Sequence, residues 1–224
     1  MENINNNIIT PNNLIECYVN GIFPMSNSRE DKEVFFVDPE YRTLIPIKGF
    51  HFSKSLKRLI KKRPFNITIN KCFPDVIRAC AIFNRDETWI NLRIQNLFIS
   101  LNEMKYAHSI ECWQDKKLVG GIYGLAIGTV FFAESMFSKV PNGSKIALSN
   151  LVAKLWQENF KILDVQFLNE HLIQFGAFEI TKSQFKEKLA LALKTKAIFH
   201  SKELTDDDLF ENLSSFIHAN IEMS

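Results

Sequence analysis

The sequence has few of the residue patterns that hold a metal ion or a disulfide framework. Its four cysteines are far apart and form no CxxC pair: Cys17, Cys72, Cys80 and Cys112. Its five histidines are equally scattered, without the spacing of metal ligands. Structural zinc sites and disulfide scaffolds both need such spacing. We therefore expect reduced thiols in a cytoplasmic protein, with no metal ion and no other cofactor.

The sequence also lacks an apolar run long enough to cross a membrane. The N-terminal residues, MENINNNIITPNN, are polar where a signal peptide would carry an apolar core. Of the 224 residues, 46% are hydrophobic and 23% are charged, a composition typical of a globular protein that buries a full core. We expect a monomer that does not contact a membrane.

One apolar stretch, Leu118–Ser138, is the centre of the sequence pattern. It predicts two strands, Leu118–Ile127 and Thr129–Met136, joined at Gly128, because most of its residues are β-branched or aromatic. Glu134 interrupts this pattern, and an unpaired carboxylate among Val, Phe and Met side chains costs several kcal/mol. Two interpretations are open: an edge strand with Glu134 facing water, or a polar group at the base of an apolar pocket.

A second apolar strand, predicted over Ile162–Phe167, carries Asp164 and Gln166 two positions apart. Because successive side chains of a strand alternate between its faces, both residues are expected to point the same way. A neighbouring strand would bring Glu134 into the same pocket. Three polar groups in an apolar setting indicate an active site, and a structural hydrogen-bond network would produce the same pattern.

The order of the predicted elements favours a mixed sheet flanked by helices, in the α/β (α+β) class. The first 45 residues are too few to hold a core alone and are expected to form a small lobe. Thr43–Ile47 contains Pro46, which cannot donate to a neighbouring strand, so we expect this segment at a sheet edge. Ser144 is expected to cap a helix, and the tail after Lys194 is expected to be mostly helical.

A strongly basic helix is predicted over Ser53–Arg63, with Ser53 as its N-cap. Lys54, Arg58 and Lys62 repeat every four residues and therefore share one face of this helix. A basic helical face is most often solvated surface. No acidic residue interrupts these charges, so an anionic partner fits the pattern equally well.

Several short motifs occur together in one order. They are Gly21–Met25 (GIFPM), Thr88–Ile90 (TWI), His108–Glu111 (HSIE), Gly120–Gly124 (GGIYG), Glu134–Ser138 (ESMFS), Ser144–Lys145 (SK) and Leu163–Gln166 (LDVQ). In this order and at this spacing they resemble the leucyl/phenylalanyl-tRNA–protein transferases, over about Leu14 to Leu193. Each motif alone is weak, whereas the whole series is hard to produce by chance.

The resemblance implies a fold and an activity. Members of that family use an acetyltransferase-like (GNAT) core with a small N-terminal lobe, which implies a lobe over residues 1–45 and a GNAT-like aminoacyltransferase domain over residues 46–224. The implied reaction moves leucine or phenylalanine, with methionine as a further donor, from aminoacyl-tRNA to the N-terminal α-amine of proteins beginning with Arg or Lys. The product is marked for degradation by the N-degron pathway. An aminoacyl ester is already activated, so the reaction needs no cofactor.

The resemblance also implies roles for residues. It places Asp164, Gln166 and Glu134 at the centre of the reaction, and these are the residues that the strand pattern selects. We expect Asp164 to orient and polarise Gln166, Gln166 to contact the attacking amine, and Glu134 to anchor an ammonium group. Replacement of Asp164 by Asn is expected to leave the fold intact and to slow the transfer.

The implied substrate-binding residues are mostly apolar. Trp89 corresponds to a family tryptophan that packs near the 3′-terminal adenosine of the tRNA. Met25 stands where relatives often have Trp, so ring stacking there is either lost or replaced by a softer thioether contact. The candidates for an apolar slot that receives the amino-acid side chain are Ile122, Met136 and Leu151.

The resemblance extends to the basic helix and has departures elsewhere. The family carries positive residues at the positions of Lys54, Arg58 and Lys62, so this face is expected to bind tRNA. A family motif of the WWSPDPR kind is present only as Phe36–Arg42 (FVDPEYR). The N-terminal lobe is also shorter than in many members, which affects the entry region rather than the core chemistry.

Two other functions are open from the sequence. An acetyl-CoA-dependent N-acetyltransferase would share the fold, but it needs a Gly-rich loop whose backbone amides bind a pyrophosphate. The loop Val140–Gly143 has one glycine and a proline without an amide donor, which disfavours this function. A non-catalytic tRNA-binding module would keep the basic helix, and the presence of Asp164 and Gln166 disfavours it.

Overall fold

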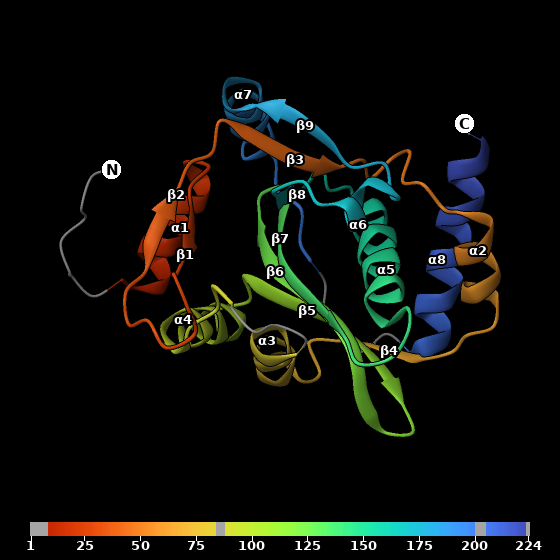
Figure 1. Cartoon of the computed structure of the whole chain (residues 1–224). Coiled ribbons are helices and arrows are strands. Elements are labelled where there is room, and N and C mark those ends of the chain that lie inside the picture. The colour runs from red at the N-terminus through yellow and green to blue at the C-terminus, as the bar shows by residue number, and fades with distance from the viewer. Residues whose placement is uncertain (1–8, 84–87, 200–204, 223–224) are drawn as a thin grey trace.

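The computed structural model describes residues 9–83, 88–199 and 205–222 of the chain (Figure 1). Its helices are α1 (Pro11–Val19), α2 (Lys54–Lys61), α3 (Phe73–Ile82), α4 (Leu92–Glu103), α5 (Gly143–Gln157), α6 (Glu170–Ile173), α7 (Lys182–Ala192) and α8 (Asp206–Glu222). Its strands are β1 (Phe23–Met25), β2 (Phe35–Val37), β3 (Tyr41–Ile45), β4 (Asn66–Ile69), β5 (Ala107–Gln114), β6 (Lys117–Ile127), β7 (Val130–Ser138), β8 (Ile162–Gln166) and β9 (Phe178–Thr181).

A seven-stranded sheet with the order β4-β5-β6-β7-β8-β3-β9 forms the centre of the fold. Its neighbouring strands are antiparallel, except that β7 and β8 run parallel. The prediction of a mixed sheet flanked by helices is therefore confirmed, in the α+β class. The predicted apolar strand pair is β6 and β7, joined at Gly128, whose positive φ of 59° suits the turn.

β3 lies inside the sheet, so the prediction of an edge strand was wrong. β3 pairs with β8 on one side and with β9 on the other. Pro46 follows Ile45, the last residue of the strand, and therefore removes no hydrogen bond from the ladder. The position of β3 places residues from the N-terminal part of the chain beside β8.

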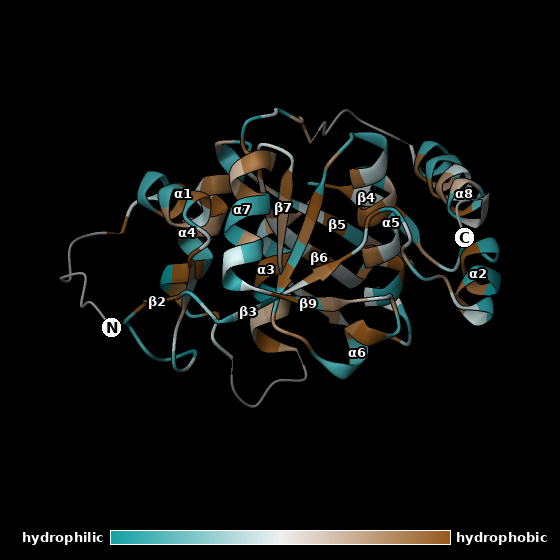
Figure 2. Cartoon of the chain, turned by 90° about the horizontal axis from the view of Figure 1, so that it is seen from above, coloured by the Kyte–Doolittle hydropathy of each residue, from teal (hydrophilic) through white to brown (hydrophobic). Residues whose placement is uncertain are grey.

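Helices cover both faces of the sheet and divide the core in two. One hydrophobic cluster joins the sheet to α2, α5 and α8, and a second cluster joins it to α1, α3, α4 and α7. Figure 1 shows α5 against the sheet, with α2 and α8 outside it. Figure 2 shows apolar strands at the centre and more hydrophilic ribbon on α2 and α8. Burial of these apolar faces is the main contribution to the stability of such a layered fold.

Serine caps were predicted for two helices, α2 and α5, and only one of them is present. Ser53 caps α2 as predicted, since its side chain accepts a backbone N–H of the first turn at 3.1 Å. The prediction that Ser144 caps α5 was wrong, because the helix begins at Gly143 after Asn142, which has a left-handed backbone (φ 72°). The backbone N–H of Ser144 donates to Oγ of Ser138 at 3.1 Å. The end of β7 thus supplies a partner for the start of α5.

The N-terminal part of the chain contains α1 and a two-stranded sheet of β1 and β2. A domain boundary at residue 45 stays a prediction, and β3, just before it, pairs within the large sheet. The predicted helical tail is confirmed by α8, while residues 200–204 lie outside the described residues. Among the residues described, none of the helices combines the length and apolarity that crossing a bilayer requires.

Candidate active site

Glu134 lies at an irregularity in the pairing of β6 and β7. Ala133 and Ser135 pair with consecutive residues of β6, so Glu134 is an extra residue between them. Such a bulge redirects a side chain and is common next to active sites. Gly124, one of the two β6 residues opposite the bulge, permits this close approach, because a Cβ atom there would overlap the carbonyl oxygen of Phe132. The glycine-rich motif of β6 therefore helps to place Glu134.

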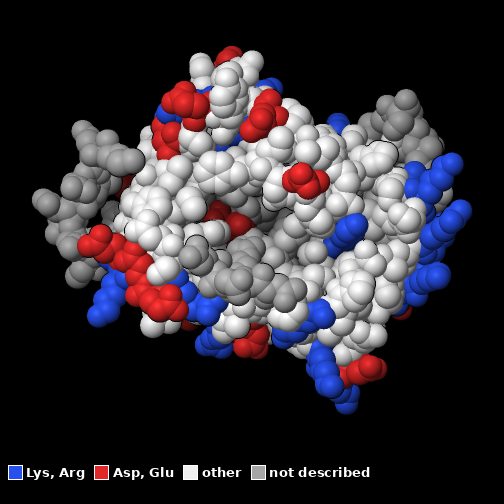
Figure 3. Space-filling view, viewed as in Figure 1, with Lys and Arg blue, Asp and Glu red and all other residues white. Residues whose placement is uncertain are grey.

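The strands β7 and β8 separate next to Glu134. Their parallel pairing covers Val130–Phe132 of β7 and Ile162–Asp164 of β8, although β7 continues to Ser138. Figure 3 shows a hollow in this face of the molecule with acidic atoms at its base. Glu134 is only 9% exposed and lies on a central strand, so its interpretation as a water-facing residue of an edge strand is wrong.

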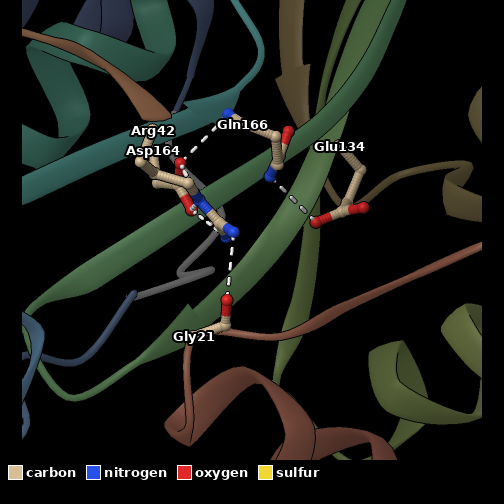
Figure 4. Close-up of polar contacts among 5 residues, drawn as sticks. All are labelled: Gly21, Arg42, Glu134, Asp164 and Gln166. Carbon is tan, nitrogen blue, oxygen red and sulfur yellow. Dashed lines mark hydrogen bonds and ion pairs between the residues drawn. The ribbon is translucent and has the colours of Figure 1, made fainter. Parts of the chain in front are cut away.

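Asp164 forms a buried ion pair with Arg42 of β3 (Figure 4). Nε and Nη2 of Arg42 donate to the carboxylate at 2.6 to 3.0 Å, and the two side chains are at most 1% exposed. Two parallel N–H donors on one carboxylate give a strong and geometrically specific contact. Asp164 Oδ1 also accepts the backbone N–H of Gln166 at 3.0 Å. Asp164 therefore contacts Gln166 as expected, but through the backbone and not through the side-chain amide.

Gln166 ends β8 with a left-handed backbone (φ 59°), which interrupts the alternation of side chains. Its amide fits in two orientations. With nitrogen toward Glu134, it donates to Oε1 at 3.4 Å (Figure 4). Turned over, the nitrogen donates to the carbonyl oxygens of Ala133 at 2.9 Å and Val165 at 3.1 Å. We adopt the second orientation because its two hydrogen bonds have ordinary lengths, and it directs the Gln166 oxygen toward Glu134.

Burial controls the protonation of Glu134. The pKa of Glu134 is raised to about 8, mainly by desolvation. Among the smaller effects, the hydrogen bond with the Tyr18 hydroxyl and the charge of Arg42 lower the pKa, and the charge of Asp164 raises it. The carboxyl is therefore largely protonated at neutral pH and can donate to the Gln166 oxygen. A cation bound beside Glu134 would favour its ionised form.

Sequence reasoning missed two residues of this site, Arg42 and Tyr18. A signal for Arg42 was present, because a buried Asp in an apolar strand needs a cationic partner and Arg42 stands in the short strand YRTLI. Tyr18, on α1, is fully buried, and its pKa is raised first by burial and then by the charge of Glu134. The segment around it, LIECYV, reads as an ordinary helix, so no pattern distinguished this tyrosine.

The predicted substrate-binding residues differ in how much surface they expose. Trp89 and Met25 are partly buried against the cluster that contains α1, α3, α4 and α7. Ile122 and Leu151 are 3% and 1% exposed in the cluster facing α5, and Met136 is partly buried against it as the cross-strand partner of Ile122. Trp89, Met25 and Met136 keep surface for a ligand, whereas Ile122 and Leu151 are core residues.

The basic face of Lys54, Arg58 and Lys62 is exposed on α2 and at its C-cap. Within the described ranges, none of these three side chains forms an ion pair. Figure 3 shows Lys and Arg along the edge where Figure 1 places α2, away from the hollow. A partner bound there would reach the site across the surface of the molecule.

The chemistry available in the hollow is that of holding and orienting an amine. An amide oxygen accepts its N–H group, a carboxyl group of raised pKa can become its counter-ion, and burial keeps both groups in place. Among the described residues, no group of His, Cys, Asp and Glu side chains is arranged to hold a metal ion. These elements suit the attack of an amine on an activated acyl group, so this α+β protein has a candidate site for acyl transfer.

Comparison with known proteins identifies the family. The family model for leucyl/phenylalanyl-tRNA protein transferase matches residues 44–190, and the model for its N-terminal domain matches residues 7–40. The chain belongs to the leucyl/phenylalanyl-tRNA–protein transferase family, and the resemblance found in the sequence is confirmed.

Curated relatives match most of the chain. A leucyl/phenylalanyl-tRNA–protein transferase of Phenylobacterium zucineum is 47% identical over 190 residues, which cover 84% of this chain and 86% of that protein. The protein of the same name from Rhodospirillum rubrum is 45% identical over 193 residues, covering 85% and 91%. The relative from Zymomonas mobilis is 44% identical over 214 residues, covering 95% of this chain and 79% of the relative.

Proposed function

We propose that this protein transfers leucine or phenylalanine, and also methionine, from aminoacyl-tRNA to the N-terminal α-amine of proteins that begin with Arg or Lys. The product enters the N-degron pathway. The observation that carries the proposal is the Gln166 amide oxygen facing the Glu134 carboxyl where β7 and β8 separate. Membership of the family supports the tRNA donor and the protein acceptor.

The reaction exchanges one acyl bond for another. The acceptor α-amine attacks the ester carbonyl, a C–N bond forms, and the C–O bond to the 3′-terminal ribose breaks. The amine loses a proton and the ribose oxygen gains one, directly or through water. Gln166 Oε1 accepts a hydrogen bond from the amine and thereby orients the lone pair of the amine nitrogen toward the ester carbonyl. Gln166 itself takes no proton.

Glu134 anchors the ammonium group of the bound aminoacyl residue. Burial raises the pKa of Glu134 even though the charge of Arg42 lowers it, so an additional cation beside the carboxyl would favour ionisation. An ammonium group that enters the pocket converts Glu134 into its ionised partner. The ionised carboxylate then binds the ammonium group that water would otherwise solvate. This contact places the ester carbonyl beside Gln166.

The remaining predicted residues bind the donor at two places. Met136 offers the exposed part of an apolar slot, with Ile122 and Leu151 behind it. Trp89 packs near the terminal adenosine, where an aromatic ring stacks on a base without reading its sequence. Met25 makes a softer thioether contact with the substrate. We also propose that the protein acts as a monomer in the cytoplasm, that its GNAT-like core spans residues 46–224, and that residues 1–45 form the lobe.

The decisive test is a direct transfer assay. The protein is incubated with Leu-tRNA and a peptide that begins with Arg, and the peptide is analysed by mass spectrometry. We expect one leucyl residue at its N-terminus, and none on the same peptide with an acetylated α-amine. Acetylation of the peptide by acetyl-CoA would identify an N-acetyltransferase instead. tRNA binding without turnover by any donor would identify a binding module.

The basic face gives a prediction about tRNA affinity. Replacement of Lys54, Arg58 and Lys62 by Gln is expected to weaken tRNA binding strongly at low salt and much less at high salt. Each phosphate contact removed should flatten the slope of log K against log salt by roughly 0.7–0.9. Transfer from aminoacyl-adenosine, which has no acceptor stem, should be nearly unchanged. Binding is measured by filter retention or fluorescence across a salt series.

The matched control replaces three other exposed lysines by Gln, with the same loss of charge: Lys188, Lys194 and Lys196. This control should leave the salt slope close to that of the wild type. Equal losses with tRNA and with aminoacyl-adenosine would show that α2 supports the fold or the pocket, and the tRNA assignment would then be dropped.

A further inference from the structure

Arg42 is the largest fully buried side chain among the described residues, and it contacts three parts of the chain at once. Besides its pair with Asp164, its Nη1 donates to the carbonyl oxygen of Gly21 at 3.0 Å (Figure 4). The guanidinium group lies 4.6 Å from the ring centroid of Phe23 and 4.6 Å from that of Phe185. It therefore joins β3 to the segment Gly21–Phe23, to α7 and to the end of β8.

These contacts lead directly to Gln166. The carboxylate that Arg42 holds accepts the backbone N–H of Gln166, and this hydrogen bond supports a left-handed backbone that a non-glycine residue rarely adopts. The backbone conformation in turn sets the direction of the Gln166 side chain toward Glu134. Phe23, which covers the guanidinium, also packs edge-on against Phe167, the residue after Gln166, with ring centroids 5.6 Å apart.

We propose that Arg42 is a positioning residue for the transfer reaction. It holds Asp164 so that the carboxylate fixes the turn at Gln166, and the contacts with Gly21, Phe23 and Phe185 hold the guanidinium group in the orientation that this needs. This inference rests on the proposed function, because the position of Gln166 matters only if its amide oxygen contacts the attacking amine.

The shape of the guanidinium group is essential to this role. It donates from three nitrogen atoms in one plane, to Asp164 and to Gly21, and offers flat faces to two aromatic rings. A lysine ammonium is a compact charge that cannot make this planar set of contacts. Arg42→Lys therefore keeps the charge beside Asp164 and loses the orientation.

The test separates positioning from stability. For the wild type and Arg42→Lys, the folded fraction is measured by circular dichroism, and kcat and KM are measured with aminoacyl-adenosine and an Arg-starting peptide. We expect kcat per folded molecule to fall about tenfold or more, with KM changed far less. The matched control is Arg63→Lys, because Arg63 pairs with Asp206 and Asp207 at the surface and is 38% exposed. This control should keep the wild-type kcat.

A double variant keeps the inference testable if Arg42→Lys folds poorly. Arg42→Gln combined with Asp164→Asn leaves no buried charge unpaired. If Arg42 acts through Asp164, adding Arg42→Gln to Asp164→Asn should lower kcat per folded molecule less than about twofold, because the Asp164 substitution has already removed the interaction through which Arg42 acts. The inference would be overturned if the fold-losses in kcat of the two single variants multiplied in the double variant. A folded Arg42→Lys variant with wild-type kcat would also overturn it. An inactive wild type would instead refute the proposed function.

Discussion

Asp164→Asn is expected to destabilise the protein by about 3–5 kcal/mol and to cut kcat about tenfold or more. The stability loss has a clear cause, since the substitution leaves the buried guanidinium group of Arg42 without its counter-ion. The activity loss follows because the carboxylate no longer holds the backbone turn at Gln166. From the sequence alone, this substitution was expected to leave the fold intact, and the buried pair with Arg42 changes that expectation.

The measurement combines urea unfolding with kinetics on the folded fraction at low temperature. Asp207→Asn is the matched control, because Asp207 pairs with Arg63 but is 77% exposed. Exposed ion pairs contribute at most about 1 kcal/mol, so the control should stay near the wild type in stability and in kcat. An Asp164→Asn variant that unfolds at the wild-type urea concentration and keeps full activity would disprove both assigned roles.

Glu134→Gln is expected to stabilise the protein at neutral and alkaline pH while reducing transfer about tenfold or more. Burial raises the pKa of Glu134 from its ordinary value of 4.5 to about 8. Between these two values the folded protein binds a proton that the unfolded chain has released, so this group lowers stability as pH rises. The loss is absent below the lower pKa and complete above the upper one.

Glutamine cannot release a proton, so the variant avoids this loss. The stability difference between Glu134→Gln and the wild type should therefore grow by about 1.4 kcal/mol per pH unit from roughly pH 5 to 8 and then level off. Tyr18, Asp164 and Arg42 face the carboxyl in both proteins, so most of their own effects cancel in the difference. Urea unfolding at each pH from 5 to 9 provides the data.

The control for this pH series is Glu103→Gln, at the exposed end of α4. Its stability difference from the wild type should stay flat with pH. A flat difference for Glu134→Gln as well would mean that Glu134 is ionised in the folded protein, and its assigned protonation would be wrong. Unchanged transfer by the variant would remove Glu134 from the reaction.

Local patterns in the sequence were sufficient for much of the fold. The apolar run Leu118–Ser138 predicted β6 and β7, and Ser53 predicted the start of α2, because side-chain alternation and helix capping depend on residues close together in the chain. The same run marked Glu134 through the cost of burying a carboxylate. The ordered series of motifs was sufficient for the family, since motif spacing is itself a property of the sequence.

Contacts between distant segments needed the tertiary structure. Arg42 and Asp164 are 122 positions apart, and only the insertion of β3 between β8 and β9 brings them together. The bulge at Glu134 depends in the same way on the register between β6 and β7. The residue pattern of a strand predicts which of its faces is apolar. It does not predict the neighbouring strand, because strand order depends on how the whole core packs.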